Sequence, residues 1–183
     1  NFLGSNIKKI AKEKAGIIKK DSPVVVGKQK KEALKIIKEV ASNLKVKTFL
    51  YEKDWSIKKN KKKNHIIFIN NLKNNKKEKY PQPSLIGEHQ IINAGIALKA
   101  FNLIMKKKLN KDFIKKGLKN VQWPGRLQKI HLNKKIFSKK INFEKWEFWF
   151  DGGHNKSASQ VLAKTFKKWD KKKLYLIFGM LNS

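Results

Sequence analysis

Apolar residues recur along the first fifty positions in a pattern that alternates between helix and strand. Spacings of three and four residues predict two helices, and compact β-branched runs predict two buried strands. Ser5 or Asn6 can cap the first helix. The expected order is a helix from residue 7 to about 15, a strand at 24–26, a helix at 31–43 and a strand at 48–51. This alternation favours an α/β domain with a parallel sheet.

The middle of the chain combines one strand pattern, two polar stretches and two helices. The apolar run at 66–69 predicts a strand. The lysine-rich stretch at 58–64 is similar to a nuclear-targeting patch, but lysines occur throughout the chain, so we expect a solvated loop there. Residues 70–79 are polar and are also expected to form a loop. Residues 90–108 carry a broad apolar face and predict the longest helix, and another helix begins at Asn110.

The last third of the chain begins at the sequence Trp-Pro-Gly, residues 123–125, which can serve as a joint between domains. An aromatic strand is expected at 146–150, a tight turn at 151–155, a helix at 157–169 and a further strand at 174–178. This order predicts a compact βαβ unit. Ligands of open α/β sheets collect beyond the carboxyl ends of the strands, which is where the turn would lie.

The chain is strongly basic, but this charge changes the expected fold and function little. The chain has 183 residues and a formal net charge of +32, yet Arg126 is the single arginine among 45 Lys and Arg residues, so the other 44 are lysines. Specific nucleic-acid sites rely on the planar guanidinium of arginine. Lysine, asparagine and isoleucine together indicate a bias toward A/T-rich codons, so we expect no specific nucleic-acid partner. A basic nucleic-acid-binding module stays an open alternative.

The sequence also limits the kinds of metal or phosphate site that the chain can form and the compartments in which it is expected. It contains no cysteine, which excludes disulfides and thiolate metal sites and fits the cytoplasm. We expect no membrane span and no leader peptide. A phosphate-binding P-loop motif is absent, because Gly27-Lys28 is followed by Gln29. The four histidines are scattered, and we expect each of them to be an ordinary surface or hydrogen-bonding residue rather than a ligand.

Four short strings remain, and their order and separation carry more information than any one of them. They are Glu-Lys-Ala-Gly-Ile at 13–17, Gly-Glu-His-Gln at 87–90 with Asn-Ala at 93–94, Trp-Pro-Gly-Arg-Leu-Gln at 123–128 and Asp-Gly-Gly-His-Asn at 151–155. Together they resemble the folylpolyglutamate synthase/dihydrofolate synthase family of the Mur ligase superfamily. The resemblance covers nearly the whole chain apart from residues 58–79.

The resemblance implies a fold and an activity. Residues 1–126 would be the later half of a Mur-ligase central ATPase domain, and residues 127–183 the start of a smaller Rossmann-like α/β domain. The full-length parent would be a cytoplasmic, monomeric enzyme that uses ATP and Mg²⁺ to join L-glutamate to the carboxylate of dihydropteroate or folate. ATP would phosphorylate the carboxylate, and the amine would then attack the acyl phosphate.

The resemblance also implies roles for five residues. Lys14 matches a lysine that is carbamylated, and the resulting carboxylate would be a catalytic ligand of Mg²⁺, which prefers oxygen. Asn93 matches an asparagine that contacts ATP, and Arg126 matches an arginine that contacts the nucleotide phosphates. Asp151 matches an acidic residue on the nucleotide side, and His154 belongs to the same turn and is expected to bind the nucleotide with it. The lone arginine independently favours a site where a bidentate fork is needed.

The chain departs from the family pattern in two ways. Gly153 stands where alanine is common, and Lys156 stands where proline is common. The family's phosphate loop and its other Mg²⁺ ligands are expected before Asn1, so we expect this chain on its own to be inactive. A different Mur-type amino-acid ligase, such as one of cell-wall synthesis, stays an alternative; the Trp-Pro-Gly-Arg string favours folate. Dihydrofolate synthase and folylpolyglutamate synthase activities cannot be separated from the sequence.

Overall fold

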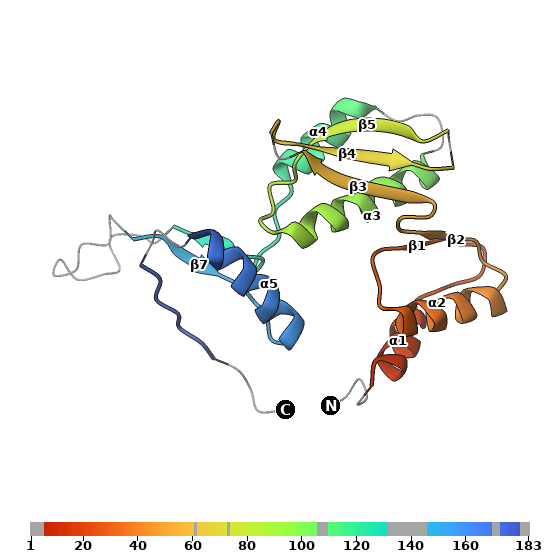
Figure 1. Cartoon of the computed structure of the whole chain (residues 1–183), viewed down its shortest axis with the longest axis horizontal. Helices are drawn as coiled ribbons and strands as arrows, with labels where there is room; N and C mark the ends of the chain where they lie inside the picture. Colours follow the sequence, from red (N-terminus) through yellow and green to blue (C-terminus); the bar gives the residue numbers. More distant parts are fainter. Residues whose placement is uncertain are drawn as a thin grey trace.

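A computed structural model describes residues 6–60, 62–72, 74–105, 110–131, 146–169 and 173–179. The elements follow one another as helices and short strands (Figure 1). Their bounds in chain order are α1 Ile7–Ala15, β1 Val24–Val26, α2 Lys31–Asn43, β2 Thr48–Leu50, β3 Trp55–Asn60, β4 His65–Asn70, β5 Lys76–Pro81, α3 Glu88–Ile104, α4 Lys111–Asn120, β6 Gln128–Ile130, β7 Phe148–Phe150, α5 Lys156–Phe166 and the 3₁₀ turn η3 Lys167–Trp169.

The N-terminal quarter folds as the hydrophobic pattern predicts. Strands β1 and β2 pair in parallel, with Val25 opposite Phe49. Helices α1 and α2 pack against each other and bury small residues such as Ala11 and Ala41, which let two helices approach closely. Asn6 caps α1, because its side-chain oxygen accepts a hydrogen bond from the backbone N–H of Lys9 at 3.0 Å. The predicted helix, strand, helix and strand are therefore confirmed.

A three-stranded antiparallel sheet follows, in the order β3-β4-β5, and two of its strands were not predicted. Residues 58–60 belong to β3 and residues 76–79 to β5, so the loops expected at 58–64 and 70–79 are wrong at these positions. The lysines concealed the strands: in β3 only Trp55 and Ile57 are buried, and in β5 only Tyr80 is. Pairing with the apolar strand β4 supplies the hydrogen bonds that make both segments strands.

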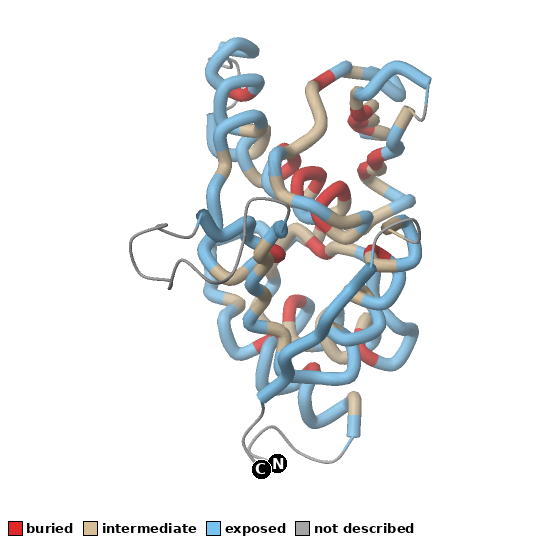
Figure 2. The backbone as a smooth tube through the Cα atoms, turned by 90° about the vertical axis from the view of Figure 1, so that its left-hand side faces the viewer, coloured by how far each residue is buried: buried red, intermediate tan, exposed pale blue. Residues whose placement is uncertain are grey.

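The inner face of this sheet packs on α3 and forms the main core (Figures 1 and 2). Trp55, Ile66 and Phe68 are completely buried there, and the indole N–H of Trp55 donates to the Phe49 carbonyl at 3.2 Å. Helix α3 approaches the sheet closely at Gly95, where a Cβ atom would lie 2.6 Å from the Trp55 ring. The two predicted helices α3 and α4 are confirmed, and Ile114 of α4 joins this core.

The C-terminal part of the chain is built differently from the expected βαβ unit. Strand β7 pairs with β6 in an antiparallel ladder, and α5 follows after the predicted turn. Residues 174–178 form no strand, so that prediction is wrong. Their apolar side chains are largely exposed, Ile177 completely. An apolar run becomes a strand only when a neighbouring strand offers hydrogen bonds, and none of the described residues pairs with this segment.

Among the described residues, no helix is both long and apolar enough to cross a membrane.

Candidate functional site

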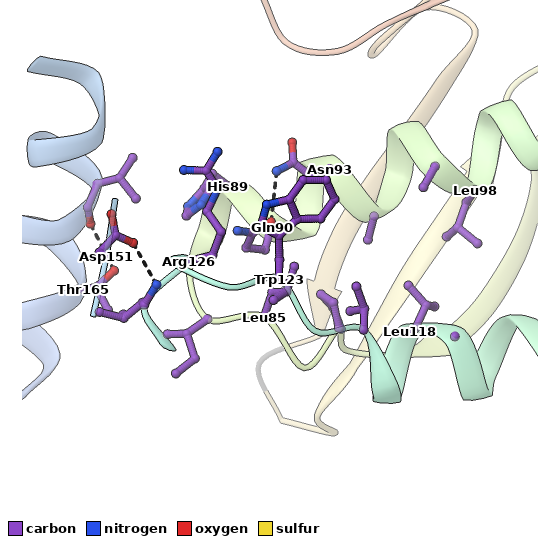
Figure 3. Close-up of a pocket in the computed structure, with 18 of the residues that line it drawn as sticks. Leu85, His89, Gln90, Asn93, Leu98, Leu118, Trp123, Arg126, Asp151 and Thr165 are labelled. Atoms are coloured by element: carbon purple, nitrogen blue, oxygen red, sulfur yellow. Dashed lines mark hydrogen bonds between the residues drawn. The ribbon is translucent and has the colours of Figure 1, made fainter. Parts of the chain in front are cut away.

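A large pocket in the described part of the chain lies where α3, α4, the Trp-Pro-Gly joint, the turn at 151–155 and α5 meet (Figure 3). Its volume is about 1100 Å³. Most of its wall is apolar, with side chains such as Leu85, Leu98, Phe113, Leu118 and Val161. The polar groups His89, Gln90, Asn93, Arg126 and Asp151 line the same space. A large apolar cavity with a few convergent polar groups is typical of a small-molecule site.

The joint that forms one edge of the pocket has an unusual backbone. Gly125 has φ +72° and Leu127 has φ +44°, a region that glycine tolerates and leucine rarely adopts. The Gly152 N–H donates to the Gly125 carbonyl at 2.9 Å, and the Gln128 side chain accepts from the Gly125 N–H at 3.0 Å. These bonds keep the joint and the turn at 151–155 in one arrangement.

Asp151 holds that arrangement through both of its carboxylate oxygens. One accepts a hydrogen bond from the Leu127 N–H at 2.8 Å, and the other accepts from the Gly153 N–H at 2.7 Å. Charge-assisted bonds of this kind are roughly twice as strong as neutral ones. The carboxylate therefore ties the strained residue Leu127 to the turn, and its first effect is on the shape of the pocket edge.

The remainder of the turn leads into α5. The Asn155 side chain accepts from the Ala158 N–H at 3.0 Å and so caps the helix. His154 is exposed, and its Nδ1 lies 3.0 Å from the Gly152 carbonyl, which that nitrogen can contact only as a donor. Asn155 lines the pocket, whereas His154 lies on the adjoining turn outside the lining.

Helix α3 contributes two amides to the opposite side of the pocket. Gln90 is buried, and its side-chain oxygen accepts a hydrogen bond from the Asn93 amide at 3.0 Å (Figure 3). This bond uses one of the two amide hydrogens of Asn93. Its other hydrogen and its carbonyl oxygen are the groups that this residue can offer to a ligand.

His89 is a pocket residue that the sequence analysis treated as ordinary. It is the second residue of α3, and its Nδ1 is buried with no hydrogen-bond partner among the described residues. Burial lowers the pKa of His89, the nearby Arg126 guanidinium lowers it further, and Asp151 acts in the opposite direction. A signal was present in the sequence, because Gly87, two residues earlier, leaves space for a ring.

Of the five predicted site residues, three line one pocket. Asn93, Arg126 and Asp151 come from α3, the joint and the turn, and Figure 3 shows all three beside the cavity. Arg126 is exposed, and its guanidinium makes no hydrogen bond or ion pair with any described residue, so it is available to an anion. Lys14 is exposed on the last turn of α1 and is not part of the pocket wall.

The described residues alone do not fit a magnesium site. In the part of the chain that the structure describes, no three His, Asp or Glu side chains lie close enough together to hold a metal ion. Mg²⁺ needs several oxygen ligands in a near-octahedral arrangement. Lys14 with a carbamate would contribute one such group.

The chain is similar in sequence and in fold to known proteins. No protein-family model matches the chain. The dihydrofolate synthase/folylpolyglutamate synthase of Bacillus subtilis is 28% identical over 186 residues, which cover 99% of this chain and 40% of that protein. The crystal structure of folylpolyglutamate synthase from Thermotoga maritima matches with a TM-score of 0.68 and 29% identity over 90% of this chain. This chain is similar, over nearly its whole length, to the folylpolyglutamate synthase/dihydrofolate synthase family.

A solved folylpolyglutamate synthase with a similar fold has been crystallised with ligands. A complex of folylpolyglutamate synthase with AMPPCP and folate matches with a TM-score of 0.69 and 25% identity, covering 91% of this chain and 38% of that one. The predicted mixed α/β fold is thereby confirmed, including its place among enzymes with Mur-ligase-type domains. The chain spans less than half the length of the relatives described above: 40% of the Bacillus protein and 36% of the Thermotoga one.

Proposed function

We propose that the protein containing this chain is an ATP-dependent ligase that adds L-glutamate to the carboxylate of folate or dihydropteroate through an acyl phosphate. The observation that carries this proposal is the pocket that gathers Asn93, Arg126 and Asp151 from three separate elements. A relative of the same fold is described as a complex with the ATP analogue AMPPCP and folate. We place the nucleotide of the present protein in this pocket.

The side chains suit the demands of phosphoryl transfer. Such chemistry depends mainly on positioning and on neutralising negative charge. Arg126 offers a planar set of donors that can hold two phosphate oxygens at once. Asn93 offers an amide to the nucleotide, and Asp151 keeps the edge of the site in shape through Leu127 and Gly153. His154, on the same turn, would contact the nucleotide only after a movement toward the pocket.

Lys14 and Mg²⁺ belong to a finer level of this proposal. We propose that Lys14 carries a carbamate in the full-length protein and that part of the protein outside this chain supplies the other oxygen ligands. The support is the Glu-Lys-Ala-Gly-Ile string at 13–17 and the exposure of the Lys14 side chain, which carbon dioxide can reach. An NMR spectrum of the full-length protein in ¹³C-bicarbonate that lacks a carbamate signal dependent on Lys14 would refute this assignment.

We also propose a division of the chain at the joint. Residues 1–126 would belong to a central ATPase domain and residues 127–183 to the following smaller domain. The support is the change from a shared core around α3 to the separate ladder of β6 and β7. We further propose a monomer, as the resemblance implies, and, from the composition, a cytoplasmic protein with no specific nucleic-acid partner.

The reaction is tested with the full-length protein. We expect ADP formation that requires both glutamate and either folate or dihydropteroate. Absence of glutamate-dependent ADP formation with every pteridine tried would refute the reaction. Comparing the two pteridines also decides between the two activities of the family.

The nucleotide site is tested by Arg126→Lys, which keeps the positive charge but removes the planar guanidinium and its paired N–H donors. A charge-assisted hydrogen bond contributes about 1.5–3 kcal/mol, and about 1.4 kcal/mol is a factor of ten. We therefore expect kcat/KM for ATP to fall about tenfold to a hundredfold. Lys119→Ala, at an exposed position on α4 outside the pocket, serves as the control. Unchanged ATP kinetics would show that Arg126 only packs at the joint.

A further inference from the structure

We infer that His89 binds the ligand of this pocket as a neutral hydrogen-bond donor, through the N–H of its Nε2, next to the Arg126 guanidinium. The inference rests on the proposed nucleotide site and adds a ligand contact to it. The ligand group would be an anionic oxygen, and for a nucleotide this means a phosphate oxygen.

The position of the ring is set by the backbone before it. Gly87 has φ +123°, a backbone conformation that residues other than glycine rarely adopt. A Cβ atom on Gly87 would lie 2.5 Å from Cε1, 2.7 Å from Nδ1 and 3.7 Å from Nε2 of His89. The edge formed by Nδ1 and Cε1 therefore packs on Gly87, and Nε2 lies farther from Gly87 than Nδ1 does. A side chain at position 87 would displace the ring.

The buried edge also decides where the single proton of a neutral ring resides. Nδ1 has no hydrogen-bond partner in the described part of the chain. A proton there would leave a buried N–H unsatisfied, and such donors are rarer in proteins than under-satisfied acceptors. The bare lone pair is therefore expected at Nδ1 and the proton at Nε2. Doubly protonated histidine would also place an unsatisfied N–H at Nδ1, so the ring is expected to remain neutral.

The charges around His89 agree with a neutral donor. Arg126 from the joint and Asp151 from the turn act on it in opposite directions, and burial, the largest cause, lowers the pKa of His89. Glu88 precedes it on α3 and contacts Lys168 of η3 at 3.0 Å. Figure 3 shows His89 and Arg126 in the same part of the pocket. An N–H donor beside one guanidinium gives an anionic oxygen two kinds of contact without a second positive charge.

The experiment compares two amides in the full-length protein with AMPPCP as the probe. In glutamine the side-chain nitrogen reaches about as far as Nε2 of histidine, whereas the nitrogen of asparagine reaches only as far as Nδ1. We expect His89→Gln to bind AMPPCP within about threefold of the parent and His89→Asn to bind it about tenfold more weakly, which is the usual loss for one hydrogen bond to a charged group. Equal weakening by both variants, or none by His89→Asn, would overturn the inference.

A matched control is available in His65. Its Nε2 is also buried with no partner among the described residues, but it lies on β4 outside the pocket wall. His65→Gln and His65→Asn should leave AMPPCP affinity unchanged, while thermal melts of all four variants record the effect on folding. Weakening by the His65 variants equal to that by His89→Asn would overturn the inference, because the effect would then not be local.

A second measurement does not depend on whether any variant folds. In the ¹⁵N-histidine spectrum of the full-length protein at neutral pH, we expect a bare Nδ1 and a protonated Nε2 for His89, and a shift of the Nε2 signal on adding AMPPCP. A proton on Nδ1, or an unmoved Nε2, would overturn the inference. AMPPCP binding without glutamate-dependent ADP formation would refute the proposed reaction and leave His89 in place. A parent protein that binds no AMPPCP would overturn the role of His89.

Discussion

The two sides of the pocket differ in how they are held. On one side, α3 rests on the three-stranded sheet, where Trp55, Ile66 and Phe68 are completely inaccessible to solvent. On the other side, Thr165 is the one buried residue among the described residues of α5, β6 and β7, although Trp149 and Trp169 approach each other with ring centroids 5.2 Å apart. The first side has its own core, whereas the second depends more on its attachment.

That attachment consists of a small number of polar contacts. Asp151 holds Leu127, Gly152 holds Gly125, and Lys168 of η3 contacts Glu88 of α3. The last pair is exposed, and exposed ion pairs contribute little to stability. The α3 side of the pocket, which carries Asn93, is therefore fixed by a hydrophobic core. The position of the α5 side is set by a few polar contacts. A site built in this way can adjust to a ligand without disturbing the core.

The sharpest test of the difference is a pair of tryptophan replacements. Trp55→Ala removes a completely buried ring and should lower the free energy of unfolding by about 3–5 kcal/mol. Trp146→Ala removes a ring that is 48% exposed and should cost about 1 kcal/mol or less. Urea unfolding of the chain measures both. Similar losses of unfolding free energy for the two variants would show that a core on the C-terminal side contributes as much to stability as the core around Trp55.

The attachment itself is tested by Asp151→Asn. The amide keeps one acceptor for the two N–H groups of Leu127 and Gly153, so one of them loses its partner. We expect a loss of about 1–3 kcal/mol in unfolding free energy, with faster hydrogen exchange at residues 125–127. Exchange that increases equally in α3 would contradict a local attachment. Asn155→Ser, which preserves a capping oxygen on the same turn, is the control.

Two helical glycines sharpen the comparison within the firm side. A Cβ on Gly95 would lie 2.6 Å from the Trp55 ring, so Gly95→Ala should destabilise by about 1–3 kcal/mol. Gly117, on α4, has nothing within 4 Å of the same position. Gly117→Ala should therefore stabilise by about 0.5–1 kcal/mol, because alanine loses less backbone entropy. Opposite signs in thermal melts would confirm that packing is tight only at the inner face.

The smallest expected effect is a difference in pH dependence. Burial, followed by the charge and the hydrogen bond of Glu78, raises the pKa of Tyr80 to about 12 from 10. Because the folded-state pKa is the higher one, this stabilisation is complete below pH 10 and is lost as pH rises toward 12. Tyr80→Phe lacks the titrating group and should lose less stability over that window. Parallel stability curves for the two proteins would contradict this account.

The sequence was informative wherever a pattern acts locally. The helices of the first half and the strands β1 and β2 follow from apolar spacing, and three of the five predicted site residues meet in one pocket. Strands β3 and β5 were missed because their identity depends on pairing with the neighbouring strand β4, which their own lysine-rich sequences do not reveal. The expected strand at 174–178 failed for the opposite reason, since its composition suits a strand but the described residues provide no partner.

His89 shows how a residue of the pocket wall escapes sequence reasoning. A histidine in a chain with three others carries no information by its type alone. Its significance comes from the ring lying on Gly87 and from the approach of Arg126, which stands thirty-seven positions later and is brought close by the fold. The string Gly-Glu-His-Gln at 87–90 contains both Gly87 and His89, but only the structure shows that the His89 ring packs on Gly87.

The lone arginine gives this chain a built-in reporter of joint movement. A protease specific for arginine has one target in all 183 residues, the peptide bond between Arg126 and Leu127. The Arg126 side chain is exposed, but the Leu127 N–H is engaged by Asp151 and its side chain is buried. We expect cleavage only while the Leu127 N–H is released from Asp151. The rate of digestion would therefore report how often the joint unfolds locally. Each cleavage would release residues 127–183 from residues 1–126, at the boundary proposed between the two domains.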